Sequence, residues 1–262
     1  GPAAVVLLAV LLVPLILVVY YSFFQNIVIE GTPWVGLQNY RTFFSDDNLW
    51  KMVRFTILFT GGSVAFHLLI GLFLTVRLNS NINRIALAVF RAIFILPWVF
   101  TAAVVAIAWQ LILAPEGILN STIGMLVGRR VFVEWLGSGP MAMMTLVLVN
   151  AWRGFPFCLT STLAGLQSIP NQLYEAGRID GATKRQMFFR ITLPLLRPVL
   201  TSVVLLDSIW TLNLFPLIWL ITGGGPLSAT ETIATLTYRY AFVNYEFGVA
   251  SAAATVGLLV TL

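Results

Sequence analysis

The chain has 262 residues, of which 59% are hydrophobic and 10% charged, and its mean hydropathy is +0.92. Soluble domains are about half apolar, so this composition excludes a water-soluble globular protein and predicts an integral membrane protein. The formal net charge is +5, but the cations occur singly between apolar stretches. This spacing argues against a nucleic-acid-binding surface.

Several apolar stretches reach the roughly 20 residues that a helix needs to cross a bilayer. In chain order, the predicted spans are residues 3–24, 52–76, 89–113, 141–163, 198–222 and 247–262. The expected fold is therefore an all-α membrane protein with about six transmembrane helices in a single domain, 1–262. Because both chain ends lie inside apolar stretches, we expect the termini to be trimmed.

Loop charges predict the orientation of these spans. The loops 77–91 and 164–197 carry eight Lys and Arg residues against only Glu175 and Asp180, whereas acids are more frequent in the other loops. By the positive-inside rule, the two basic loops are cytoplasmic. Both chain ends then also lie on the cytoplasmic side.

The loop 164–197 has the signals of a helix-turn-helix. Ser168 predicts an N-cap, followed by a helix that runs through Glu175, and Asp180-Gly181 predicts a turn. A second helix from Ala182 would gather Met187, Phe188 and Ile191 into an exposed apolar knob. The residues alone fit two interpretations: a docking surface for another protein, or an amphipathic linker at the membrane interface.

The motif spacing in this loop resembles the EAA loop of bacterial binding-protein-dependent ABC permeases. In that family the loop forms a coupling helix seated in a cleft of a cytoplasmic ATPase, so the resemblance implies that Glu175 faces a basic partner. Gly177 stands where the family has a second alanine, which weakens a helix by up to about 1 kcal/mol, and we expect docking to survive. The implied coupling residues are Glu175, Ala176, Gly177, Asp180, Gly181, Ala182, Phe188, Ile191 and Pro194.

A second resemblance narrows the class. The stretches Leu220–Pro226 and Phe247–Ala252 are similar to the carbohydrate branch of this family, typified by the larger permease of the maltose importer. The resemblance implies the type I ABC importer permease fold in a bacterial inner membrane. It also implies a second permease subunit in a heterodimer, two cytoplasmic ATPase subunits and an extracytoplasmic sugar-binding protein.

Ionisable side chains inside spans are functional candidates because burying them in hydrocarbon is costly. His67, Arg153 and Asp207 qualify. Counted from the cytoplasmic ends at 1.5 Å per residue, Arg153 and Asp207 both lie about 13 to 15 Å deep. Either these two residues pair across the fourth and fifth spans, or they line a cavity. For His67 we expect a neutral, packed side chain without a charged partner.

The same depth offers groups suited to a sugar. Pro97, Pro156 and Pro216 interrupt three spans, and interrupted helices are tolerated where they line a cavity. Aromatic faces and amides nearby, including Trp98, Trp210 and Asn150, suit a neutral polyol. The maltose-type resemblance implies substrate contacts by Trp98, Ala102, Trp152, Arg153, Gly154, Phe157, Asp207, Trp210, Thr211 and Leu214. We expect a disaccharide such as trehalose, while glycerol phosphate would suit the charge of Arg153.

Other chemistry is not supported by the sequence. The two lysines, Lys51 and Lys184, are followed by Met52 and Arg185, so no phosphate loop is present, and ATP and Mg²⁺ belong to partner ATPase subunits. A single histidine and a single cysteine argue against a metal cluster or a catalytic triad. We therefore expect neither catalysis nor a cofactor in this chain.

Two other classes of membrane protein fit the sequence less well than an ABC permease does. A self-contained secondary carrier would couple an ion gradient to Arg153 and Asp207, but it calls for inverted repeats, and the two halves of the chain have no matching hydropathy pattern. A membrane enzyme acting on lipid-linked sugar would need acid and base residues grouped at one interface, which the sequence does not provide.

Overall fold

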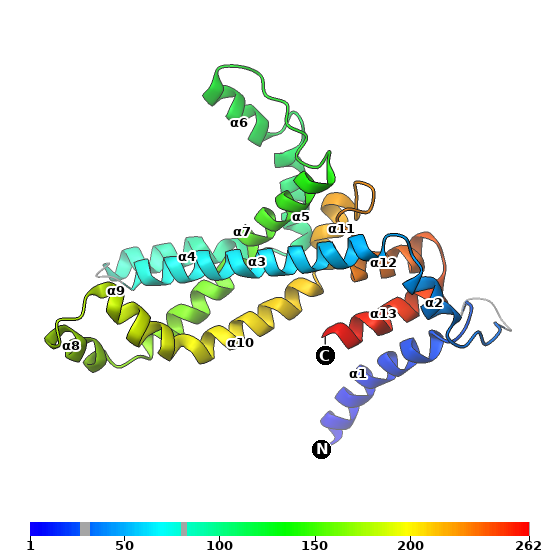
Figure 1. The fold of residues 1–262 in the computed structure, drawn as a ribbon, viewed down its shortest axis with the longest axis horizontal. Coiled ribbons are helices and arrows are strands. Elements are labelled where there is room, and N and C mark those ends of the chain that lie inside the picture. The colour runs from blue at the N-terminus through cyan, green and yellow to red at the C-terminus, as the bar shows by residue number, and fades with distance from the viewer. Residues whose placement is uncertain (27–31, 80–82, 262) are drawn as a thin grey trace. The chain divides into compact units, whose positions relative to one another are not determined.

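The computed structural model describes residues 1–26, 32–79 and 83–261, and its regular structure is helical (Figure 1). Within these described ranges, β pairing is limited to an isolated antiparallel bridge between Phe24 and Trp34. The predicted all-α fold is thereby confirmed. The helices are α1 (Pro2–Tyr21), α2 (Gln38–Phe44), α3 (Leu49–Leu78), α4 (Arg84–Val99), α5 (Ala102–Leu113), α6 (Ile118–Val127), α7 (Gly139–Gln167), α8 (Asn171–Ile179), α9 (Lys184–Met187), η1 (Phe188–Thr192), α10 (Leu193–Leu212), α11 (Phe215–Thr222), α12 (Ile233–Tyr238), η2 (Arg239–Val243) and α13 (Phe247–Thr261), where η marks a π-helix.

Each predicted span overlaps at least one apolar helix. Among the described residues, four helical stretches have at least 18 residues and enough apolar character to cross a membrane: Leu49–Leu78, Ala102–Val127, Gly139–Gln167 and Lys184–Leu212. Shorter apolar helices cover Val5–Tyr21, Ile85–Val99 and Phe247–Thr261. The last residue of the sixth predicted span, Leu262, lies outside the described residues, as do residues 80–82 of the first basic loop.

Two of the predicted spans are not continuous helices. The span 89–113 divides into α4 and α5, because the backbone becomes extended at Phe100, soon after Pro97. The span 198–222 divides into α10 and α11, with Pro216 in the first turn of α11. A proline lacks the N–H that would continue the hydrogen-bond ladder, so Pro216 cannot donate back to the last turn of α10, which explains the second break. Pro97 lies within α4, which continues beyond it to Val99. Pro156, by contrast, lies inside α7 without ending it.

The chain folds into two compact units: unit 1 comprises Gly1–Leu58, Ile112–Met143 and Asn213–Leu262, and unit 2 comprises Phe59–Leu111 and Met144–Leu212. In unit 2, α3 and α7 approach closely at glycines. A Cβ on Gly71 would lie 2.7 Å from the Cβ of Cys158, so a larger residue would force the helices apart. One helical step further along, the hydroxyl groups of Thr75 and Thr162 lie 2.7 Å apart and join the same two helices.

Unit 1 is organised around α13, which packs beside α1, α2 and α12. A Cβ on Gly248 would collide with the carbonyl oxygen of Phe24, so glycine permits this approach. The buried Asn39 amide donates to the carbonyls of Ser22 (2.8 Å) and Phe24 (2.7 Å) and fixes the chain after α1. Within this unit, α1 begins and α13 ends at the same end (Figure 1), as an even number of spans requires.

Candidate functional site

The loop 164–197 folds as a helix-turn-helix with boundaries that differ from the prediction. The first helix, α8, begins after Pro170 rather than at Ser168, whose hydroxyl instead donates to the Gly165 carbonyl (2.8 Å). The predicted turn is present, with Gly181 in the left-handed region at φ +74°. The second helix begins at Lys184 rather than Ala182, because Thr183 and Gln186 form a capping box.

The apolar knob predicted to be exposed is half-buried. Met187 and Ile191 pack against α8 at Gly177, where an added Cβ would lie 3.3 Å from Ile191 Cδ1 and 3.5 Å from Met187 Cγ. The Tyr174 and Thr192 hydroxyls, 2.9 Å apart, join the same two segments. These contacts hold α8 beside α9, as Figure 1 shows. The knob therefore stabilises the loop internally, and its predicted exposure is wrong.

Other side chains form the outward surface of the loop. Ile179, at the end of α8, is 86% exposed, and Phe189 is also exposed. Glu175, Ala176 and Asp180 are exposed beside them. Sequence reasoning did not single out Ile179, although its position before the Asp180-Gly181 turn marks it as a helix end.

Within the predicted spans of unit 2, three aromatic side chains form a connected surface. The ring of Phe157 on α7 lies 6.3 Å from Trp98 on α4 and 4.8 Å from Trp210 on α10. Trp98 is 42% exposed and Trp210 is 49% exposed, so both side chains stay partly accessible. Sequence analysis predicted all three as substrate contacts, and the fold brings them together. Trp98 precedes the α4–α5 break, and Trp210 lies near the end of α10.

A buried polar pair lies in the same unit. His67 Nδ1 on α3 is 2.7 Å from Asp207 Oδ2 on α10, and His67 Nε2 donates to the Asn150 carbonyl on α7 (2.8 Å). Both side chains are almost fully buried. Since a carbonyl can only accept, Nε2 carries a proton, and a hydrogen bond joins Nδ1 to the Asp207 carboxyl group. The pair joins three helices.

This arrangement corrects two expectations. Asp207 pairs with His67, so the alternative in which Arg153 pairs with Asp207 is wrong, as is the prediction that His67 lacks a charged partner. A detectable signal existed: His67 is about nine residues from the inner end of its predicted span, which gives it the depth of Asp207. Depth alone does not say which face of a helix a residue occupies.

Arg153 is left without a counter-ion inside the described part of the chain. The side chain is half-buried, and its Nε is buried without a hydrogen-bond partner there. Arg153 lies four residues before Phe157 on α7, so the two share one helix face. A guanidinium stays charged at any relevant pH. The aromatic surface therefore has an uncompensated positive charge beside it.

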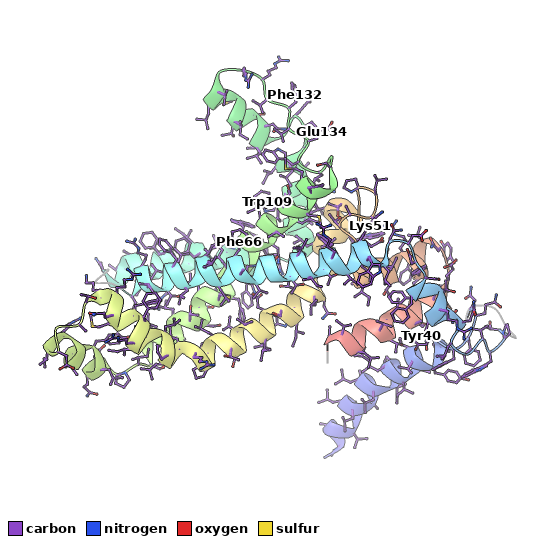
Figure 2. All side chains as sticks on the ribbon, in the orientation of Figure 1. Tyr40, Lys51, Phe66, Trp109, Phe132 and Glu134 are labelled. Carbon is purple, nitrogen blue, oxygen red and sulfur yellow. The ribbon has the colours of Figure 1, made fainter. Side chains whose placement is uncertain are left out.

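The remaining predicted contacts are spread over several environments. Trp152 is exposed and meets Trp109 of α5 (labelled in Figure 2) edge-on at 5.7 Å. Gly154 is covered by the His67 ring, because an added Cβ would overlap its Cε1 and Nε2 atoms. Ala102 is half-buried at the start of α5, Thr211 is buried on α10, and Leu214 belongs to unit 1.

The Gly-Gly-Gly-Pro stretch in unit 1 encloses a second charged pair. Glu231 Oε1 lies 2.9 Å from Arg239 Nε, and Arg239 Nη2 donates to the Gly223 carbonyl (2.9 Å). Burial raises the pKa of Glu231, an effect that Arg239 opposes. Burial also raises the pKa of Tyr240, helped by the hydrogen bond that its hydroxyl donates to Asp46 (2.6 Å).

Comparison with known proteins decides the family. Residues 67–262 match the family described as binding-protein-dependent transport system inner membrane component. The chain belongs to this family. It is thus an inner-membrane permease component of a binding-protein-dependent importer, and the alternative of a self-contained carrier finds no support.

Sequence alignments with related proteins cover most of the chain. The trehalose/maltose transport system permease protein MalF of Thermococcus litoralis is 34% identical over 96% of this chain and 84% of its own length. The sulfoquinovosyl glycerol transport system permease protein SmoG of Agrobacterium fabrum is 31% identical over 98% and 83%. A crystal structure of a bacterial ABC transporter involved in importing the acidic polysaccharide alginate contains a chain with TM-score 0.86 and 24% identity, covering 99% of this chain and 88% of that chain. The type I ABC importer permease fold is thereby confirmed.

Proposed function

We propose that this permease carries a sugar, and that the sugar stacks on the aromatic surface of Trp98, Phe157 and Trp210. The observation that carries the proposal is that aromatic rings from α4, α7 and α10 lie in contact within the predicted spans, with Trp98 and Trp210 exposed. Sugars present flat C–H faces that pack on such rings. The three rings follow one another at centroid distances of 6.3 and 4.8 Å, and an extended sugar such as the disaccharide trehalose would lie along them.

Two polar groups add hydrogen-bonding capacity. The Arg153 Nε on the α7 face that carries Phe157 has no hydrogen-bond partner among the described residues, and a guanidinium suits a hydroxyl group or a phosphate of the cargo. Asn150 is 1% exposed, so its predicted cargo contact needs the helices to separate. Names of relatives support a sugar-type cargo, since they include trehalose, maltose and sulfoquinovosyl glycerol.

The proposal includes the rest of the importer. A second permease subunit, two cytoplasmic ATPase subunits and an extracytoplasmic binding protein would complete it, with both termini of this chain in the cytoplasm. The chain itself would not be catalytic. ATP-driven closure of the ATPases would act on α8 through Glu175 and its exposed neighbours, and would switch access to the aromatic surface from one side of the membrane to the other.

Cargo binding is tested by sugar-stimulated ATP hydrolysis of the importer purified from native membranes. Trp210→Ala removes one end of the aromatic surface, and we expect the sugar concentration for half-maximal stimulation to rise about tenfold, equivalent to about 1.4 kcal/mol. Trp50→Ala is the matched control, because Trp50 is 79% exposed in unit 1. Equal responses of the two variants would contradict the proposed site.

Coupling is tested separately. Glu175→Ala, or deletion of Asp180-Gly181, should lower co-purification of the ATPase or uncouple hydrolysis from sugar. Glu134→Ala is the control, since Glu134 is another exposed acid but lies outside the loop (labelled in Figure 2). Intact co-purification together with normal sugar-stimulated hydrolysis in the Glu175 variant would refute this role of the loop.

A further inference from the structure

The hairpin formed by α6 and the segment that returns from it, residues 118–135, lies outside the predicted spans. One face of α6 carries Ile118 and Met125 with Leu126 beside them, and these side chains are 68%, 84% and 82% exposed. Residues 118 and 125 are two helical turns apart and therefore share a face. Thr122 between them donates its hydroxyl to the Ile118 carbonyl (2.8 Å), so it offers no free donor. We call Ile118, Thr122, Met125 and Leu126 the apolar stripe.

The opposite face of α6 is fixed within the hairpin by Asn120, which is 1% exposed. Its amide donates to the carbonyls of Pro115 (3.0 Å) and Val133 (2.9 Å), and its Oδ1 accepts from Trp135 Nε1 (3.0 Å). These bonds hold the returning segment against α6, so the hairpin itself covers that face of the helix. The hairpin cannot turn its stripe inward without breaking them.

Charge is distributed unevenly along the hairpin. Arg129 and Arg130 follow α6 at the tip, are exposed, and form no ion pair among the residues that the structure describes. The acids Glu116 and Glu134 lie at the base, and Phe132 is 64% exposed on the returning segment (Phe132 and Glu134 are labelled in Figure 2). The tip therefore offers two cations beside exposed apolar side chains.

The tether restricts where this hairpin can lie. Four residues separate the end of α5 at Leu113 from the start of α6 at Ile118, and an extended chain of that length reaches at most about 18 Å. The stretch Ala102–Val127 is as apolar as a membrane span. An apolar stripe held this close to the bilayer lowers its free energy by entering the headgroup and acyl boundary.

We propose that α6 is an interfacial helix that rests on the outer leaflet, with its apolar stripe in the boundary region and Arg129 and Arg130 bound to anionic lipid phosphates. Exposed stripe, cationic tip and short tether together match an amphipathic interfacial helix. The hairpin would anchor the outer ends of the third and fourth spans. This role is independent of the cargo.

The test uses the assembled importer in lipid nanodiscs. A polarity-sensitive fluorophore is attached at Met125→Cys and, as a matched control, at Ser138→Cys, an exposed polar position directly before α7. Cys158 is buried, and the unsubstituted chain checks that it stays unlabelled. At position 125 we expect blue-shifted emission, quenching by lipids brominated near the headgroup, and protection from iodide. The control should show the opposite pattern.

The arginines are tested with Arg129→Gln/Arg130→Gln in the Met125→Cys chain. Brominated phosphatidylglycerol should quench more than brominated phosphatidylcholine, by up to about fivefold per arginine, equivalent to about 1 kcal/mol, and the double variant should lose this preference. Iodide access at position 125 equal to the control would overturn the proposal. So would shielding from both lipid and iodide, or shielding that needs the binding protein, since either result identifies a protein partner. An unchanged lipid preference would overturn the role of the arginines.

Discussion

Among the described residues, two acid–base pairs occur, one in each unit, and they differ in what they hold together. His67 and Asp207 are 140 residues apart and, with the Asn150 carbonyl, connect α3, α7 and α10. Glu231 and Arg239 belong to one loop and the helix that follows it. The first pair fixes the tertiary arrangement of helices at span depth, whereas the second shapes a local turn.

The side chains of the two pairs also differ in solvent exposure. The side chains of His67 and Asp207 are 1% and 6% exposed, whereas those of Arg239 and Glu231 are 35% and 2% exposed. Water can therefore reach one member of the loop pair but neither member of the span pair. Loss of a partner should cost more in unit 2, where the remaining group cannot be hydrated.

Asp207→Ala should produce the largest effect. It leaves the His67 ring buried without its partner, and we expect a loss of about 3–5 kcal/mol in unfolding free energy. Asp207→Asn should be much milder, because an amide can donate to Nδ1 of a neutral histidine that keeps its Nε2 proton for Asn150. Thermal unfolding of the purified importer in detergent measures both.

The control for this prediction is Asp47→Ala, which removes an exposed acid in unit 1. If Asp207→Ala were no more destabilising than Asp47→Ala, the pair would not hold the three helices together. Equal losses for Asp207→Ala and Asp207→Asn would show instead that the ionised carboxylate is required.

Gly154→Ala should have the next largest effect. Its Cβ would overlap the His67 ring, so the ring or the helix must shift, which costs about 1–3 kcal/mol. Gly61→Ala on α3 is the control, since an added Cβ there meets nothing within 4 Å. His67→Ala in the Gly154→Ala background should relieve the overlap, and a double variant whose losses simply add would refute this explanation.

Local signals predicted local structure well. The Asp180-Gly181 turn followed from dipeptide chemistry, and Gly181 does adopt a positive φ. The breaks after Pro97 and before Pro216 lay where prolines were noted, but the sequence did not show that Pro156 would leave α7 intact. Whether a proline ends a helix depends on neighbouring helices that satisfy the freed carbonyl.

The candidate site was only partly predictable. Depth counting placed Arg153 and Asp207 at one level, and the family resemblance supplied Trp98, Phe157 and Trp210. The sequence could not assign Asp207 to His67, because that choice depends on which helix faces meet. The close approach of α3 to α7 at Gly71 and Gly154 fixes the face of α3 that carries His67, and this approach is a property of packing rather than of either segment alone.

Arg239→Gln tests the loop pair and should cost about 1 kcal/mol. The loss is smaller than for Asp207→Ala because Glu231 can take up a proton once its cation is gone. Unfolding at neutral pH, compared with Arg54→Gln near the N-terminal end of α3 as a control cation, measures the effect. A loss as large as that of Asp207→Ala would remove the distinction between the two pairs.

The smallest expected effect is a pH dependence of the folding stability that comes from Glu231. Burial raises the pKa of Glu231 above its ordinary value of 4.5, so the folded state holds this proton more tightly than the unfolded state. Stability from this group is full below pH 4.5 and is lost as the pH rises through the raised pKa. The difference in melting temperature between the unsubstituted chain and Glu231→Gln should therefore grow in favour of the glutamine variant as pH rises from 4.5. Since Arg239 lowers the pKa of Glu231, Arg239→Gln should extend this fall to higher pH. A difference that is flat with pH would show that Glu231 keeps its ordinary pKa in the folded loop.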